Sequence, residues 1–166
     1  MSALPQEPIP VPQQPRGDVA ERRQVAAARR QARHYAVQAL YQWSVSRAVL
    51  ADIEQQFRED FDFRGTDLAY FQELLHNVPA EVGDLDALML PFLDIAAEKL
   101  GPVERAVLRI ATYELKARID VPFRVVINEA VALTRKFGAA ESHRFVNAVL
   151  DKVARELRSA ELRAGR

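Results

Sequence analysis

Five arginines near the start of the sequence have the spacing of a phosphate-binding helix face. On a helical wheel Arg22, Arg23, Arg29, Arg30 and Arg33 fall within an arc of about 120°, with no acidic side chain between them. Their charge opposes the helix dipole at an N-terminus, and burying an unpaired guanidinium group would cost far too much. We therefore expect these turns to face water or an anionic partner; a solvated helix start is the alternative.

A second basic face is predicted on the last long helix. Glu141, Arg144, Phe145, Lys152 and Arg155 form a stripe beside the apolar stripe that faces the core. An aromatic ring flanked by cations suits base stacking with phosphate contacts. Phe145 could equally be a core residue, and periodicity alone leaves both interpretations open.

The sequence offers no residues for catalysis, for a metal or for a cofactor. There is no cysteine, and His34, His76 and His143 are scattered without metal-ligand spacing. Ser142 and His143 are adjacent on a helix, so their side chains point in different directions and cannot form a triad. We expect a non-enzymatic binding protein.

The charge is segregated along the chain, although the formal net charge is zero. Residues 1–50 carry 7 basic and 3 acidic side chains, residues 51–100 carry 3 and 12, and residues 101–166 carry 13 and 8. This pattern indicates one basic binding face and an acidic surface elsewhere. No apolar run approaches the ~20 residues of a membrane span, and no secretory signal is visible, so a cytoplasmic protein without a membrane partner is predicted.

The elements that must position these residues are all helical. Residues 1–16 are proline-rich and predicted to be a disordered tail, residues 17–163 a single compact all-α domain, and residues 164–166 a short tail. Short links between helices predict antiparallel neighbours. Apolar periodicity, caps and glycines predict about seven helices: 18–46, 49–60, 67–79, 81–96 with a break near Pro91, 102–118, a sixth opened by Asp120 and Pro122 and ended by Gly138, and 140–162.

Three segments resemble the NusB family of bacterial transcription antitermination factors. They are "RRQARHYAVQALYQW", "LGPVERAVLRIATYEL" and "VPFRVVINEAVALTRKFGAAESHRFVNAVLDKVA", and the resemblance covers roughly residues 27–155. It implies an all-α fold of two small packed helical bundles. It also implies binding of single-stranded boxA RNA in nascent ribosomal RNA transcripts, together with the ribosomal protein NusE, in a complex that helps RNA polymerase pass terminators.

The resemblance also implies roles for individual residues. RNA contacts are expected at positions matching the family's arginine-rich segment and its patch on the last long helix: Arg29, Arg30, Arg33, Tyr41, Glu141, Arg144 and Phe145. Positions on the NusE-facing surface match Phe92, Glu98 and Glu104, and the acidic middle of the chain suits a basic ribosomal protein. Family members can carry tyrosine at the position of Phe92 and aspartate at that of Glu141.

Two other functions are weighed against this one. NusB-like domains also occur in ribosomal RNA cytosine methyltransferases, but that activity needs an α/β methyl-donor domain and a catalytic cysteine, and this sequence has neither. A helical protein–protein scaffold, or a homodimer that masks its RNA face, stays open.

Overall fold

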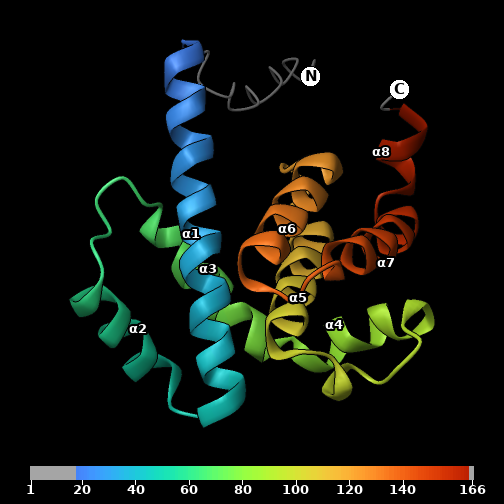
Figure 1. Ribbon diagram of the computed structural model, residues 1–166. Coiled ribbons are helices and arrows are strands. Elements are labelled where there is room, and N and C mark those ends of the chain that lie inside the picture. The colour runs from blue at the N-terminus through green and yellow to red at the C-terminus, as the bar shows by residue number, and fades with distance from the viewer. Residues whose placement is uncertain (1–17, 165–166) are drawn as a thin grey trace, which may run out of the picture.

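The computed structural model describes residues 18–164, which form helices joined by short loops, with no strand among them (Figure 1). The predicted proline-rich tail at residues 1–16 lies outside this range. The described helices are α1 (Val19–Ser46), α2 (Leu50–Asp60), α3 (Leu68–Ala80), α4 (Val82–Met89), the 3₁₀ turns η1 (Leu90–Phe92) and η2 (Ala97–Lys99), α5 (Pro102–Ala117), α6 (Phe123–Phe137), α7 (Ser142–Leu157) and α8 (Ser159–Ala164).

The helices pack as two groups that share one contact surface. Helices α1, α2 and α3 pack together, and α5, α6 and α7 form the second group (Figure 1). Helix α5 also packs against α1, α3 and α4, so it lies at the junction of the two groups. The predicted all-α fold is confirmed.

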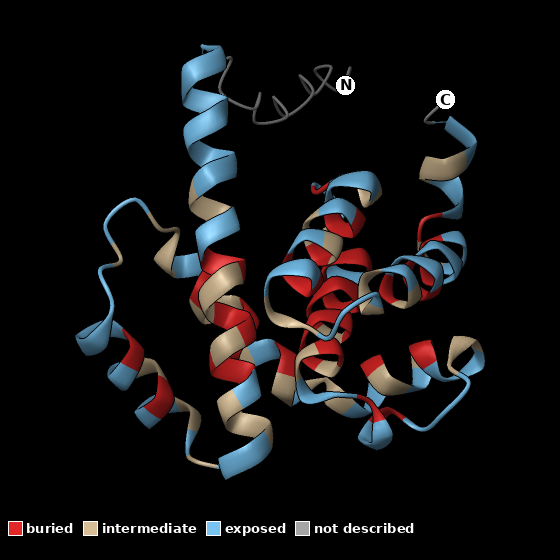
Figure 2. Cartoon of the chain, in the orientation of Figure 1, coloured by how far each residue is buried: buried red, intermediate tan, exposed pale blue. Residues whose placement is uncertain are grey.

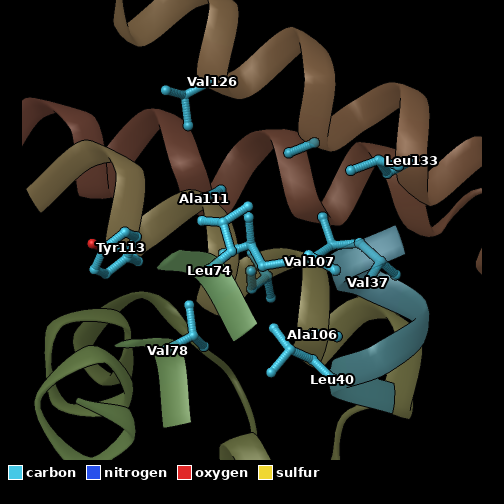
Figure 3. Close-up of a cluster of buried hydrophobic side chains, with 14 of the residues drawn as sticks. Val37, Leu40, Leu74, Val78, Ala106, Val107, Ala111, Tyr113, Val126 and Leu133 are labelled. Carbon is cyan, nitrogen blue, oxygen red and sulfur yellow. The ribbon is translucent and has the colours of Figure 1, made fainter. Parts of the chain in front are cut away.

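One continuous hydrophobic core joins the two groups. Figure 3 shows Val37 and Leu40 of α1 beside Val107 and Ala106 of α5, and all four side chains are buried. Burying one large aliphatic side chain contributes about 1.5–3 kcal/mol, so this seam holds α1 firmly against the centre of the molecule. The same helix α1 is buried only over part of its length, as Figure 2 shows.

The structure confirms one predicted break and divides one further helix. The helix expected over residues 81–96 with a break near Pro91 ends at Met89, and Pro91 lies in the 3₁₀ turn η1, because proline has no N–H group to continue an α-helix. The helix expected over 140–162 ends at Leu157, and a short α8 follows after Arg158.

Arg158, the residue that follows α7, has its side chain inside the fold. Its guanidinium group is buried and donates hydrogen bonds to four backbone carbonyls, those of Glu114, Leu115, Arg118 and Val121, at 2.7–3.1 Å. Three of these carbonyls belong to the last turn of α5 and the residue after it; those of Glu114 and Arg118 also accept from the Arg118 and Val121 N–H groups at 2.9 and 3.0 Å. Arg158 therefore acts as a side-chain cap for α5.

Across residues 18–164, none of the helices combines the length and the apolar character needed to cross a bilayer.

Candidate nucleic-acid interface

The first turns of α1 extend beyond the rest of the molecule. Every residue from Val19 to Ala27 is exposed, and Ala32 is the first buried residue of the helix (Figure 2). The Asp18 side chain caps the helix by accepting from the Ala20 N–H at 3.2 Å. We call residues 19–31 the basic arm; it carries Arg22 and Arg23 in full contact with solvent. The first turns of α1 thus face solvent, as predicted for Arg22 and Arg23.

Arg33 corrects the expectation that all of these arginines face solvent. It is only 3% exposed, and its Nε and Nη2 atoms donate to Glu114 of α5 at 2.9 and 2.8 Å. Burial lowers the pKa of Arg33, but the adjacent Glu114 carboxylate outweighs burial and raises it, so the side chain stays charged. An unpaired guanidinium group would indeed be costly to bury. The expectation was wrong because the pairing carboxylate comes from another helix.

Tyr70 of α3 completes this buried cluster. Its hydroxyl donates to Glu114 Oε2 at 2.5 Å, and the Arg33 guanidinium lies 5.4 Å from the centre of its ring. Burial and the neighbouring carboxylate of Glu114 raise the pKa of Tyr70, so its hydroxyl keeps its proton. The cluster joins α1, α3 and α5 at the base of the basic arm. Arg33 is accordingly a structural residue in this conformation, and no phosphate can reach it.

Arg29 and Arg30 have intermediate and exposed positions. The Arg29 side chain is about a quarter exposed, lies 3.6 Å from the Asp120 carboxylate and stacks on Tyr70. Arg30 is 60% exposed, and its Nε atom is 3.2 Å from Glu129 of α6. An exposed pair of this kind contributes little to stability, so Arg30 is free to exchange Glu129 for a phosphate.

Tyr41 lies on the same side of α1 as Arg30, about three helical turns further along. It is 43% exposed and borders an apolar hollow between α1 and α2. Periodicity places Arg23, Arg30 and Tyr41 along one line of the helix. A ligand strand on this side of α1 can therefore contact the basic arm and Tyr41 together.

The turn between α6 and α7 packs beside this part of α1. The His34 ring lies 5.0 Å from the Phe137 ring, and Lys136 Nζ is 3.1 Å from His34 Nδ1. Burial and the charge of Lys136 lower the pKa of His34, which favours the neutral ring. Lys136 was missed by the sequence analysis, although the pair Arg135–Lys136 directly precedes Phe137 and was a visible basic signal.

The residues predicted on α7 begin directly after this turn. Arg144 is exposed and its Nε atom is 2.9 Å from Glu141, which precedes the helix in a left-handed conformation. Phe145 is half-buried and packs against the core, and its contact with RNA stays a prediction. Lys152 is exposed two turns further on. The end of α6 thus connects α1 with the start of α7, because Phe137 lies against His34 and Glu141 follows four residues later.

Glu104 was predicted to lie on the NusE-facing surface, but the structure buries it. It is 8% exposed, and its Oε1 atom accepts from the Ala139 N–H at 2.9 Å and from the Ser142 hydroxyl at 2.8 Å. Burial alone raises the pKa of Glu104, but these hydrogen bonds outweigh it and lower the pKa. Its carboxylate fastens the α6–α7 turn to the start of α5.

Phe92 and Glu98 lie together in the segment between α4 and α5. Phe92 ends η1 and is half-buried, while Glu98 is exposed in η2. Leu90 and Ile95 in the same segment are 59% and 47% exposed, which the sequence analysis did not single out. Two large exposed apolar side chains beside an acidic one are typical of a surface that another protein covers.

The described part of the chain holds no group of three or more histidine and acidic side chains placed to bind a metal ion.

Comparison with known proteins gives a consistent result. The chain matches the model of the NusB family over residues 30–155. It is 52% identical over 155 residues to the transcription antitermination protein NusB of Pseudomonas putida (strain GB-1), which covers 93% of each chain. NusB of T. maritima is 31% identical, with a TM-score of 0.66 over 76% of this chain and 90% of that chain. Antitermination factors NusB and NusE in complex with double-stranded RNA share the fold at 22% identity and a TM-score of 0.66, over 76% of this chain and 96% of that one.

Proposed function

Because the chain belongs to the NusB family, we propose that it is a transcription antitermination factor that binds boxA RNA of nascent ribosomal RNA transcripts together with the ribosomal protein NusE. In this proposal the RNA-bound pair joins the transcribing RNA polymerase and helps it pass terminators, which places the protein in the cytoplasm. The solved complex of NusB and NusE with RNA has the same fold and supports proposing both partners. The protein's role is binding, without catalysis.

The observation that carries the RNA part of the proposal is the basic arm. An exposed helix start with Arg22, Arg23 and Arg30 has no packing role that explains its arginines. Arg29, Tyr41 and the α7 residues Glu141, Arg144, Phe145 and Lys152 extend this surface. Cations bind phosphates and release counterions, while Tyr41 and Phe145 supply rings for bases.

The test is the salt dependence of RNA binding, measured by fluorescence anisotropy with a boxA oligonucleotide. Three to five phosphate contacts give a slope of log K against log[salt] of about −2 to −3.5 for single-stranded RNA. The triple variant Arg22→Ala/Arg23→Ala/Arg30→Ala should make the slope less negative by about 2 and lower the affinity at least tenfold.

The matched control removes the same charge elsewhere. Arg58, Arg124 and Arg163 are exposed on α2, α6 and α8. Replacing all three by alanine should leave the slope nearly unchanged. A slope near zero for the wild-type protein, or equal losses in the two triple variants, would refute RNA binding by the arm.

The NusE part of the proposal is placed on the segment between α4 and α5. Phe92→Ala and Glu98→Lys should weaken binding to NusE in calorimetry and leave RNA affinity without NusE unchanged. Glu156→Lys, an exposed acidic site on α7, is the control. Light scattering with and without RNA tests the remaining alternative: a dimer that RNA dissociates would indicate a masked RNA face.

A further inference from the structure

An apolar hollow of about 530 Å³ lies between α1 and α2, beside the proposed RNA face. We call it the α1–α2 hollow. Its walls include Val37, Tyr41 and Val45 of α1. They also include Phe57 of α2, Phe61 directly after α2, and Phe137 at the end of α6. Three large apolar side chains at this hollow are unusually open to solvent: Tyr41, Val45 and Phe61 are 43%, 63% and 39% exposed. A grouped apolar surface of this kind on a soluble protein marks a binding site.

The aromatic walls of the hollow are held in place by other rings. The Phe61 ring lies 5.2 Å from both the Tyr35 ring and the Phe57 ring. The Phe137 ring lies 5.0 Å from the His34 ring of α1. A ligand that stacks on such rings loses little free energy to ordering them, because their positions are already fixed.

Two amide side chains give the hollow a polar edge. Gln42 Nε2 donates to Gln56 Oε1 at 3.0 Å, which connects α1 to α2. Among the described residues nothing bonds to Gln42 Oε1 or Gln56 Nε2, so one acceptor and one donor remain for a ligand. A donor next to an acceptor is the arrangement that reads the edge of a nucleobase. Asp60, also on the lining, disfavours an anionic phosphate there.

We propose that the α1–α2 hollow takes one unstacked nucleobase of the RNA strand that α1 binds. This inference rests on the proposed RNA-binding function and adds a base-reading site to it. Single-stranded RNA is recognised by bases that leave the stack, rest on aromatic side chains and form hydrogen bonds through their edges. Arg30 and Tyr41 share one side of α1, so a strand whose phosphates lie on the basic arm has Tyr41 at the mouth of the hollow.

The test fills the hollow with a bulky side chain and measures whether one base of the RNA then no longer contributes to affinity. Val45→Trp places a large ring at the mouth of the hollow. Val49→Trp is the matched control, because Val49 is 65% exposed, lies four residues away and does not line the hollow. Binding to a boxA oligonucleotide is measured by anisotropy, together with a series of oligonucleotides that each lack one base. Val45→Trp should weaken binding at least fivefold, the loss expected for one stacked base, and Val49→Trp less than twofold.

The base-less oligonucleotides identify what occupies the hollow. In the wild-type protein one position should lose at least fivefold when its base is removed, and Val45→Trp should erase that loss, because the base no longer has a site. Gln56→Leu, an exposed substitution, should reduce discrimination between bases at that same position. Unchanged affinity of a folded Val45→Trp protein would overturn the inference. So would losses that multiply at every position, because the substitution and the missing base would then act independently. Absence of any RNA binding by the wild-type protein would instead refute the proposed function, and this inference with it.

Discussion

Replacing Arg33 by methionine should destabilise the protein strongly while leaving its intrinsic affinity for RNA intact. The side chains of Arg33 and Glu114 are 4% and 2% exposed, and three hydrogen bonds of 2.8–3.1 Å join them. Removing one partner of a buried pair leaves an uncompensated charge and costs about 3–5 kcal/mol. In Arg33→Met the Glu114 carboxylate keeps only the Tyr70 hydroxyl as a close donor.

Arg30→Met is the matched comparison, three residues earlier on the same helix. Its guanidinium group is 60% exposed and pairs with Glu129, so its loss should cost only about 0.2–1 kcal/mol. Urea unfolding followed by circular dichroism measures both variants. For a domain of this size the loss at Arg33 corresponds to a melting temperature lower by roughly 6–20 °C.

RNA affinity should show the opposite order. At a temperature where both variants are folded, Arg30→Met should weaken binding to a boxA oligonucleotide, and Arg33→Met should bind like the wild-type protein. Suppose that Arg33→Met lowers the free energy of unfolding by less than about 1 kcal/mol and weakens RNA binding more than Arg30→Met does. Arg33 and Glu114 then do not form a buried pair. Arg33 would then be a surface residue, as the sequence alone suggested.

Three further predictions concern residues that connect the helices. Arg158→Ala should lower the free energy of unfolding by at least about 2 kcal/mol in urea titrations, because the buried carbonyls of Leu115 and Val121 lose the Arg158 donor, whereas those of Glu114 and Arg118 still accept from backbone N–H groups. Arg158→Lys should recover only part of the loss, because an ammonium group cannot span all four carbonyls. Burial raises the pKa of Glu104, but hydrogen bonds outweigh burial and hold the pKa below its usual value of 4.5. The ionised carboxylate therefore stabilises the fold above that pH. The stability advantage of the wild-type protein over Glu104→Gln should be largest near neutral pH and shrink as the pH falls below 4.5. Gly138→Ala should lower the free energy of unfolding by about 1–3 kcal/mol in thermal unfolding, because the added Cβ atom would lie 2.8 Å from the Thr134 backbone oxygen. Gly83→Ala, whose Cβ atom would have nothing within 4 Å, should stabilise α4 by about 0.5–1 kcal/mol. Equal effects at the two glycines would contradict this reasoning.

The ends of most helices could be predicted because their causes are local. Pro102 starts α5, as expected from its preference for the first helical position. Gly138 follows α6 as predicted, but with an extended backbone instead of the left-handed one typical of glycine caps. The same local information predicted the exposed start of α1, since a helix face that carries arginines followed by apolar residues changes its surroundings along its length.

The surroundings of Arg33 could not be predicted from periodicity, because Glu114 lies 81 residues away in the sequence. A helical pattern says which face a residue occupies, but not which side chain lies opposite. A signal was nevertheless present: Glu114 interrupts the apolar stripe of α5, as Arg33 interrupts that of α1. Opposite charges within two core stripes predict a buried pair. Arg158 shows the same limit, because only the fold reveals the carbonyls that it caps.

The position of the buried cluster at the base of the basic arm has a consequence for hydrogen exchange. Downstream of Ala32 the amides of α1 are held by core packing and by the Arg33–Glu114 pair, so they exchange with solvent only when the whole protein unfolds. Residues 19–27 of the arm are all exposed, and a helical segment this short without packing is marginal in water. Its amides should therefore exchange by local fraying and slow down when RNA binds. In the proposed RNA complex part of the binding free energy would be used to order the first turns of α1, so the rigidity of the arm would contribute to the affinity for RNA.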